Sequence, residues 1–461
     1  MSATAFASNC NRPPENRKKI PGDTAAGKNE PIDGTGLART LRNSGKIGRV
    51  ALWGVIRYNK AIVVVSLCMC NGVLTMASVV RLDLKEVVRH FKQLEDPRSA
   101  VNRLHPLESV IVIAIMAVLA GANGPTAIAE WAKMKCELLL KLLDLPHGIP
   151  RKDVFRRVLI TLKPDAFQAC FTMWLTALRA AAAEATGVER PTLAVDGKTV
   201  RRSHDRRRNL GALHSVTVWA SEFGLTLAQV ATAEKSNEIT AIPELLSLVD
   251  IQGAIITIDA MGTQTAIAEK IIDGGGDYIL ALKGNQGTLH DAVIDYINEQ
   301  TKTDFQGIGA RRLDTAEKKH GRIESRTYVQ MPAPKSLPGF NNWKGLLSIG
   351  IAFLWSIRDG KETTEVRYFI SSLAVKVKQF AHAVRSHWGI ENGCHWCLDV
   401  TYREDESRIR DVHLRENFAW LNRLTLSLLK QHPDENSVAM KRRDCGWNDE
   451  YMLQVLTGTS L

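Results

Sequence analysis

The sequence has few cysteines, no internal repeats and no coiled-coil heptads. Its 8 cysteines are scattered over 461 residues, which excludes a disulfide framework and favours the reducing cytoplasm. Without repeats or long heptad segments, a chain of this length is expected to fold into two to four globular domains.

The protein also lacks a strong charge imbalance outside its N-terminal part. The net charge is +11, yet residues 1–75 contain 11 Lys and Arg against 4 Asp and Glu, and the remaining 386 residues contain 49 against 45. A DNA-binding surface must therefore come from local basic clusters, because the bulk charge of the body does not supply one.

The N-terminal part has no sustained hydrophobic period. Residues 1–50 are polar and are expected to be disordered. Residues 61–80 carry no charge, and three interpretations stand: a membrane span by length, a partly buried strand or helix, or a stretch translated from a start placed upstream of Met76. We favour the third, with no membrane contact, because regular helical patterning is expected to begin at Met76. A chain starting there is then expected to be soluble and fully active.

Residues 82–187 are expected to form an all-helical domain. Leu84, Val87 and Phe91 recur at helical spacing. The apolar run 107–120 is too short to cross a membrane and fits a buried helix. A long Ala-rich helix over 164–185 ends at a Thr-Gly pair. No residue of this domain suggests catalysis.

From residue 191 the pattern changes to short apolar strands. Strands are predicted over 192–196, 213–220 and 225–233, followed by a helix over 239–249. Two further strands, 254–259 and 278–282, flank a helix over 263–273. A meander leading into strand–helix–strand units predicts an α/β protein with a mixed sheet. Helices are also predicted over 379–398 and 413–430.

Two aspartates end predicted strands of this sheet. Asp196 stands in AVDGK and Asp259 in TIDAMG. If the two strands are neighbours, the carboxylates face each other and need a cation between them, and Mg²⁺ prefers such oxygen ligands. The alternative is that each Asp caps the turn that follows it.

A third carboxylate lies in VRSHWGIEN. Glu391 would let the site hold two ions, one for the attacking oxygen and one for the leaving oxygen. Arg385 and His387 are candidate phosphate contacts, and Trp388 is a candidate stacking platform for an unpaired base. An exposed Glu on an amphipathic helix is the plainer interpretation of Glu391.

A zinc site competes for the same segment. His387, Glu391 and His395 are spaced by four residues, and Cys394 and Cys397 form a CxxC motif around the second histidine. Zinc binds such sets, but the sequence has no second cysteine pair at finger spacing.

Basic and polar residues follow several of the predicted strands. A run of six cations begins two residues after the first Asp, and phosphate binding competes with a solvated loop as its explanation. This run consists of Lys198, Arg201, Arg202, Arg206, Arg207 and Arg208. Further candidate DNA contacts in polar turns are Lys235, Asn237, Lys283 and Asn285.

Several motifs occur together and in order. They include AVDGKTVRRS, EKSNEITAIPELL, TIDAMGTQ, DYILALKGNQ and VRSHWGIENGCHWCLDVTYRED. Over residues 83–430 the chain resembles the DDE transposases of bacterial insertion sequences, in the ISAs-type branch with the H-repeat-associated proteins. Residues 83–180 resemble the helical transposase-associated domain of that branch, and residues 1–75 match no motif of it.

The resemblance implies a ribonuclease-H-like catalytic domain over residues 188–435, with a mainly strand insertion at about 284–370 and a C-terminal tail over 436–461. Residues 1–81 remain an unmatched extension. It implies that Asp196, Asp259 and Glu391 are catalytic and hold two Mg²⁺ or Mn²⁺ ions. Where wider relatives place Tyr, Arg and Lys around the Glu, this chain has Val384, His387 and Leu398, which weakens the phosphate roles.

The expected activity is cleavage and strand transfer of double-stranded DNA, by a homodimer on paired element ends, in the cytoplasm with the nucleoid. No small-molecule substrate is expected. Two alternatives are a Mg²⁺-dependent nuclease that does not transpose and a DNA-binding transposase remnant with a dead site.

Overall fold

The computed structural model describes residues 51–58, 61–70, 73–80, 84–232, 238–319 and 322–458, with the backbone alone over 51–80. The first three strands form an antiparallel sheet of their own, in the order β1-β2-β3. They are β1 (Ala51–Tyr58), β2 (Ala61–Cys70) and β3 (Val73–Val80). Met76 thus lies inside a strand, and the helical pattern expected from it begins at Leu84 instead. The disorder expected for residues 1–50 concerns residues outside the described part.

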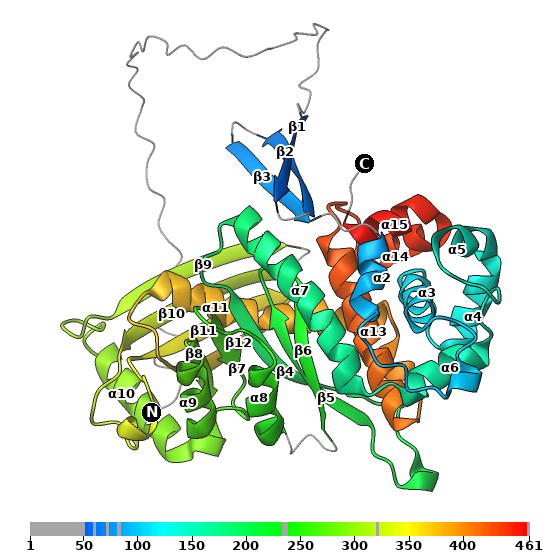
Figure 1. Cartoon of the computed structure of the whole chain (residues 1–461). Coiled ribbons are helices and arrows are strands. Elements are labelled where there is room, and N and C mark those ends of the chain that lie inside the picture. Colours follow the sequence, from blue (N-terminus) through cyan, green and yellow to red (C-terminus); the bar gives the residue numbers. More distant parts are fainter. Residues whose placement is uncertain are drawn as a thin grey trace, which may run out of the picture.

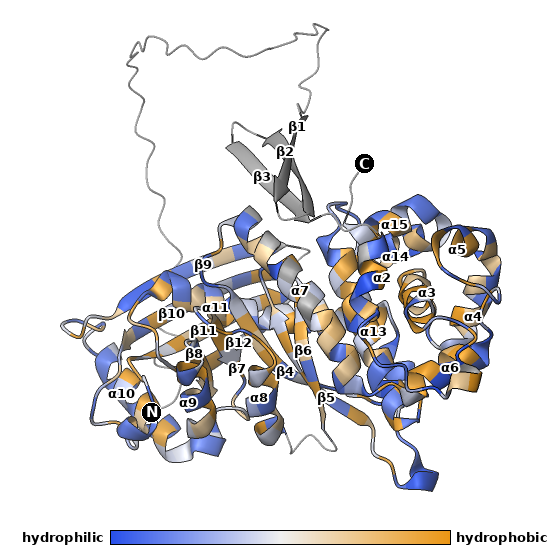
Figure 2. Ribbon diagram, in the orientation of Figure 1, coloured by the Kyte–Doolittle hydropathy of each residue, from blue (hydrophilic) through white to orange (hydrophobic). Residues whose placement is uncertain are grey.

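The helical region is organised around α3 (Leu107–Leu119), a helix that is apolar on every side. All residues of α3 except Glu108 are buried. It packs against α2, α4 and α6, as expected for a helix without a polar face. Figure 2 shows these apolar surfaces turned inward. The helices are α2 (Leu84–Phe91), α3 (Leu107–Leu119), α4 (Pro125–Met134), α5 (Cys136–Leu142), α6 (Lys152–Thr161) and α7 (Pro164–Thr186). In the described part of the chain, no helix is long and apolar enough to cross a membrane.

The C-terminal residues fold back onto this helical region. α14 (Val438–Trp447) and α15 (Asp449–Thr457) both pack against α3. Arg442 donates from Nε to the Val118 carbonyl at 3.2 Å and from a terminal nitrogen to the Thr401 carbonyl at 2.8 Å. The segment treated above as a tail is therefore part of the helical core.

A nine-stranded mixed sheet forms the other half of the molecule, in the order β6-β5-β4-β7-β8-β12-β11-β10-β9. β7 pairs in parallel with β4 and β8, and the remaining pairs are antiparallel. The expected α/β class with an all-helical region before it is confirmed. The first five strands are β4 (Thr192–Val200), β5 (Leu213–Ala220), β6 (Leu225–Thr232), β7 (Ile255–Ile258) and β8 (Asp277–Leu282).

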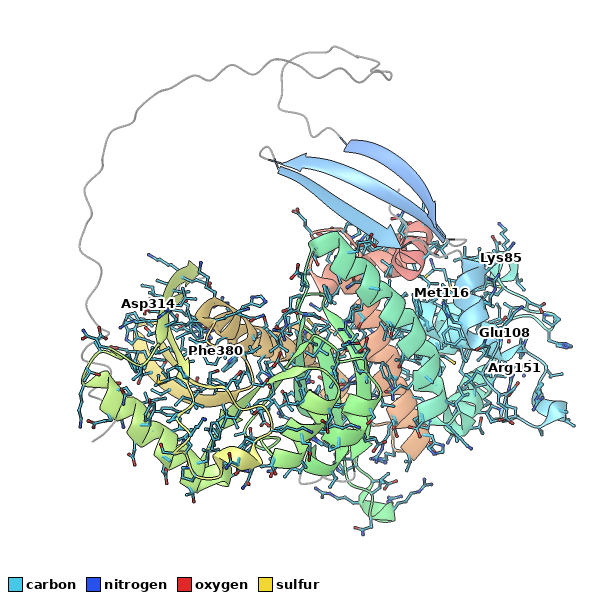
Figure 3. All side chains as sticks on the ribbon, turned by 60° about the vertical axis from the view of Figure 1, so that its left-hand side comes forward. Lys85, Glu108, Met116, Arg151, Asp314 and Phe380 are labelled. Carbon is cyan, nitrogen blue, oxygen red and sulfur yellow. The ribbon has the colours of Figure 1, made fainter. Side chains whose placement is uncertain are left out.

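The expected insertion extends this sheet. Its strands are β9 (Arg311–Lys319), β10 (Arg322–Pro332), β11 (Ser348–Arg358) and β12 (Lys361–Ser371). β12 pairs with β8, so the inserted strands form one continuous sheet with the first five strands. Figure 3 shows Asp314 of β9 and Arg151 of the helical region at opposite ends of the molecule, with Met116 and Phe380 inside the two halves.

Helices cover both faces of the sheet (Figure 1). α11 packs across β4, β7, β8, β9 and β10, while α8 packs against β5 and β6. These helices are α8 (Glu238–Ser247), α9 (Thr265–Asp273), α10 (Gly287–Thr301), α11 (Val377–Ile390), α12 (Trp396–Val400) and α13 (Val412–Gln431).

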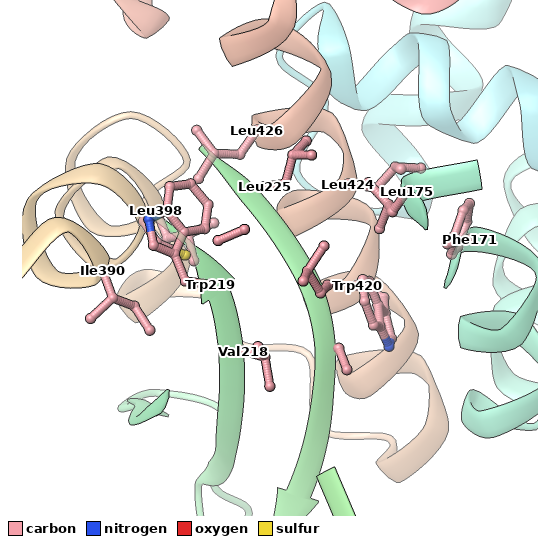
Figure 4. Close-up of a cluster of buried hydrophobic side chains, with 14 of the residues drawn as sticks. Phe171, Leu175, Val218, Trp219, Leu225, Ile390, Leu398, Trp420, Leu424 and Leu426 are labelled. Atoms are coloured by element: carbon pink, nitrogen blue, oxygen red, sulfur yellow. The ribbon is translucent and has the colours of Figure 1, made fainter. Parts of the chain in front are cut away.

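The helix α13 joins the two halves. Every residue from Asn417 to Leu429 is buried, and the helix packs against α3, α6 and α7 as well as β6. In Figure 4, Trp420 and Leu424 lie beside Phe171 of α7, while Leu426 lies on the side of Trp219. One continuous apolar core therefore connects the helical region to the sheet.

A half-buried carboxyl group in the second turn of α13 makes stability depend on pH. Burial, helped by nearby Asp165, raises the pKa of Glu416 to about 7. Because the folded-state pKa is raised, the fold loses stability as pH rises from about 4.5 to about 7. Glu416→Gln should therefore increase the free energy of unfolding by up to about 3 kcal/mol at pH 8 and by less than about 1 kcal/mol at pH 5.

Thermal or urea unfolding at the two pH values measures this difference. Glu435→Gln, at an exposed position, is the control and should change neither value. Equal stabilisation of Glu416→Gln at both pH values would show that Glu416 titrates normally.

Candidate active site

Two strands side by side carry the first two carboxylates. β4 and β7 run parallel, with Val195 opposite Ile258, so Asp196 and Asp259 follow at matching positions. The sequence predicted that the first strand ends at Asp196. In the structure, β4 continues to Val200. Alternation along β4 sends Asp196 and Lys198 to one face and Gly197 to the other.

The third carboxylate lies where the helix of α11 changes its winding. α11 ends at Ile390, and Glu391–His395 form one π-helical turn, η6, before α12 continues. A single helix over 379–398 was expected. Such π turns are rare and occur often at functional sites. Gly393 within the turn faces Trp219, since a Cβ there would lie 3.2 Å from Trp219 Cζ2.

This turn places Glu391 and His395 above Asp196. Nδ1 of His395 lies 3.6 Å from Asp196 Oδ2 and 3.7 Å from Glu391 Oε2. Ligand atoms of these three residues all lie within 4.8 Å of one another, a grouping that suits a metal ion. Asp259 lies outside that group, and its Oδ1 accepts hydrogen bonds from the backbone N–H of Met261 at 3.1 Å and of Gly262 at 3.3 Å.

The electrostatics of the group follow from its burial. Desolvation, together with the charges of Glu391 and Asp259, raises the pKa of Asp196 to about 6 even though His395 acts to lower it. The adjacent His395 lowers the pKa of Glu391. The carboxylates of Asp196 and Glu391 therefore lie close together at the border between the core and the solvent, and a cation between them would offset their repulsion.

The predicted phosphate contact at His387 has a different environment. Burial lowers the pKa of His387 to about 4, and its Nδ1 lies 3.0 Å from Thr257 Oγ1. The imidazole is therefore neutral near pH 7 and offers a hydrogen bond at most, without a positive charge.

The cysteines of the zinc alternative do not fit a metal site among the described residues. Both cysteines of the CxxC motif are buried, and burial raises the pKa of Cys394 to about 12 and that of Cys397 above its usual value. Zinc binds thiolates, which these thiols do not readily form. The potential metal-binding group contains His395 with Asp196 and Glu391, and neither cysteine belongs to it.

Lys198, the first residue of the predicted basic run, is buried and forms ion pairs within the fold. Its side chain is 6% exposed, and Nζ lies 2.6 Å from Asp399 and 3.3 Å from Asp405. Two carboxylates thus neutralise the ammonium inside the fold. The predicted DNA contact for Lys198 does not fit this geometry, because β4 continues through Lys198 and its ammonium is paired with these two carboxylates.

The rest of the run faces solvent. Arg201 is 81% exposed and pairs with Asp405 at 3.1 Å, and Arg202 is exposed. Residues 206–208 form the 3-10 turn η2, in the β4–β5 connection that projects from the body at the lower right of Figure 1. All three of its arginines are exposed.

The remaining candidate DNA contacts differ in their environments. Lys283 is exposed, whereas the Asn285 amide donates to the Ala260 carbonyl and so holds the loop after Asp259. Lys235 and Asn237 lie outside the described residues. Arg385 pairs with Glu317 at 2.8 Å.

The indole of Trp388 is partly covered by a cation. The side chain is 40% exposed, and the guanidinium of Arg367 lies 4.2 Å from the ring centroid. A cation over an aromatic face is an attractive contact, so a base that stacks on Trp388 must displace Arg367 or share the ring with it.

A cavity of about 540 Å³ opens between the inserted strands and α11. Its lining includes Arg322, Arg326, Arg367, Arg385, Trp388 and Glu391. Arg322, Arg326 and Arg367 were not predicted as site residues. They lie on β10 and β12, and only the pairing of the strands brings them close together. The alternation of HGRIESR, with Arg322, Glu324 and Arg326 two residues apart, was the available signal. Glu324 pairs with both of these arginines.

The sheet order, the two carboxylates carried by neighbouring parallel strands and the inserted strands match those expected of a DDE transposase, and the comparisons agree with this class. A family model described as DDE_Tnp_1-associated matches residues 88–175, and the model for the transposase DDE domain matches residues 187–428. The chain belongs to the transposase DDE domain family, and its catalytic half has the ribonuclease-H-like fold expected above.

Known relatives cover most of the chain. It is similar to "H repeat-associated putative transposase YhhI" of Escherichia coli (strain K12), at 35% identity over 389 residues, covering 82% of this chain and 100% of that protein. "Putative transposase YncI" of Escherichia coli O157:H7 is 36% identical over 386 residues, covering 82% and 96%. A piggyBac transposase synaptic complex with hairpin DNA aligns with 82% of this chain and 80% of that one at 10% identity and a TM-score of 0.34, too distant for a comparison of sites.

The glycine after Asp196 has no room for a side chain. A Cβ on Gly197 would lie 2.8 Å from His214 Nε2 and closer still to Glu238 Oε1. These two groups form a buried pair at 2.7 Å, and His214 Nδ1 lies 2.7 Å from Thr199 Oγ1. The pair therefore packs directly against the strand that carries Asp196.

Gly197→Ala should destabilise the protein by about 1–3 kcal/mol, because the added methyl group overpacks this pair. Gly284→Ala is the control, since a Cβ there meets nothing within 4 Å. Urea unfolding measures both. Wild-type stability of Gly197→Ala would show that the His214–Glu238 pair does not constrain the strand.

Proposed function

We propose that this protein cleaves double-stranded DNA at the ends of an insertion sequence and joins the freed 3′-hydroxyl to target DNA. Asp196, Asp259 and Glu391 would hold two divalent ions, Mg²⁺ or Mn²⁺. The observation that carries the proposal is the approach of Glu391 to Asp196 from a distant part of the sequence, next to the strand that leads into Asp259.

The donor set fits hard divalent cations. Three carboxylates supply the oxygen ligands that Mg²⁺ and Mn²⁺ accept. Burial is the main cause of the raised pKa of Asp196, and the neighbouring carboxylates of Glu391 and Asp259 add to it, so a bound cation would favour the ionised form of Asp196. Bound ions would activate the attacking oxygen and stabilise the leaving oxygen of a phosphodiester.

The protein's own groups prepare this site. The N–H groups of Met261 and Gly262 orient the Asp259 carboxylate through one oxygen, which leaves the other free for a ligand. The Asn285 amide fixes the backbone at Ala260. Glu391 is 59% exposed, so it faces the solvent side from which DNA would arrive. These groups position reactants, and positioning is a large part of such catalysis.

Two basic surfaces are proposed to bind DNA. The arginines of η2 are exposed on a projecting arm and are proposed to contact phosphates, which carry no sequence information. The cavity beside Glu391 offers the guanidinium groups of Arg326, Arg367 and Arg385. Phosphate oxygens would compete there with the glutamates that now pair with these arginines. A homodimer on paired ends, acting on nucleoid DNA in the cytoplasm, is proposed from the family.

One prediction of the proposed function concerns the three carboxylates. Asp196→Asn, Asp259→Asn and Glu391→Gln keep side-chain shape and remove a charge that the ions require. Each should reduce cleavage of a supercoiled plasmid carrying the element with its own flanks at least about a thousandfold, equivalent to about 4 kcal/mol. DNA binding in a mobility-shift assay and the melting temperature should remain near wild type.

Asp291→Asn, at a 79% exposed carboxylate, is the matched control and should cleave normally. Near-normal cleavage by any of the three variants removes that residue from the site. Cleavage without joined products in a strand-transfer assay would identify a nuclease instead of a transposase.

Another prediction of the proposed function concerns the projecting arm that carries η2. Arg206→Ala, Arg207→Ala and Arg208→Ala together should weaken binding to all DNA sequences and reduce the slope of log affinity against log salt by up to about 3 units, at about 0.9 per phosphate contact. The control replaces Lys302, Lys335 and Lys361, all exposed, and removes the same charge elsewhere. An unchanged slope in the arm variant would show that η2 is a solvated loop that does not contact DNA.

A further inference from the structure

We propose that His395 is a nitrogen ligand, through Nδ1, of the divalent ion that Asp196 and Glu391 hold, and that it makes this position favour Mn²⁺ over Mg²⁺. The inference rests on the proposed function for the presence of a divalent ion. It assigns to that ion a ligand outside the three carboxylates.

The distances describe a gap between three ligand atoms. His395 Nδ1 lies 3.6 Å from Asp196 Oδ2 and 3.7 Å from Glu391 Oε2, which is too long for a hydrogen bond. Two atoms bound to the same ion at about 2.1 Å each lie at most about 4.2 Å apart. Both separations fit within that limit. The side chain of Glu391 is 59% exposed, so its carboxylate can move closer to a bound ion.

The imidazole is held in place and is incompletely satisfied. His395 is 5% exposed and sits in the π turn η6. Its Nε2 is buried without a hydrogen-bond partner among the described residues. The Nδ1 edge of the ring faces the carboxylates of Asp196 and Glu391. A cation bound between these three groups would offset the repulsion between the two carboxylates.

The π turn explains why this residue reaches the site. Glu391 and His395 are four residues apart and both approach Asp196. The same spacing suggested zinc in the sequence, but the cysteines beside it turn into the core. The third ligand comes instead from β4, a strand far earlier in the chain.

An imidazole ligand changes the metal preference. Mg²⁺ binds oxygen and retains water, whereas imidazole nitrogen suits the transition metals. The position with His395 should therefore bind Mn²⁺ more tightly than Mg²⁺. Loss of an outer-shell partner already costs about 10–100-fold in metal affinity, so loss of a direct ligand should cost about tenfold or more for Mn²⁺ and less for Mg²⁺.

Pulsed electron paramagnetic resonance of the full-length protein with Mn²⁺ tests the ligand directly. We expect an imidazole ¹⁴N coupling in the wild type and its loss in His395→Gln, which retains a polar side chain of similar reach. Calorimetric titration should show Mn²⁺ affinity lowered about tenfold or more in His395→Gln and His395→Ala, with Mg²⁺ affinity changed less. His382→Ala, at an exposed histidine of α11, is the control.

Failure of this inference is distinct from failure of the proposed function. Bound Mn²⁺ without ¹⁴N coupling in the wild type, or no Mn²⁺ binding at all, overturns the histidine ligand, and the wild-type spectrum requires no variant to fold. Plasmid cleavage in the same preparation tests the function separately. Coupling without cleavage would leave the ligand standing and contradict the transposase activity.

Discussion

The parallel pairing of β4 and β7 is the constraint on which the site depends. It sets Val195 opposite Ile258, and so brings Asp196 and Asp259 to one edge although a hairpin and a helix separate them along the chain. Both strands are buried between helices, so a shift by one residue would turn each carboxylate to the opposite face. The pair of aspartates is therefore held by the same packing that holds the core.

The helix carrying Glu391 is fixed by a second set of buried contacts. After α12, Glu404 forms an ion pair with Arg423 of α13 at 3.1 Å, with side chains 2% and 0% exposed. Arg423 also donates to Ser215 of β5 at 3.2 Å. A buried pair of this kind contributes little net stability but is costly to break from one side. It ties the segment after Glu391 to the sheet that holds Asp196.

Short-range sequence patterns predicted most of the helices and strands. Features that depend on strand pairing or on distant residues could not be predicted. The strands of 192–282 and the buried helix of 107–119 follow from apolar runs and their breakers. The buried environment of Lys198 could not be predicted, because its partners, Asp399 and Asp405, lie in a distant part of the sequence. The arginine cavity depends on the pairing of β10, β11 and β12. The π turn has no sequence signal beyond Gly393, whose role depends on contact with Trp219.

A crystal structure with Mn²⁺, recorded at the manganese absorption edge, tests the central claim most directly. The account predicts anomalous density at the edge of β4 and β7, within about 2.5 Å of carboxylate oxygens from Asp196, Asp259 and Glu391. Density confined to another part of the protein, or an Asp259 carboxylate that takes no part in binding while the others do, would contradict it.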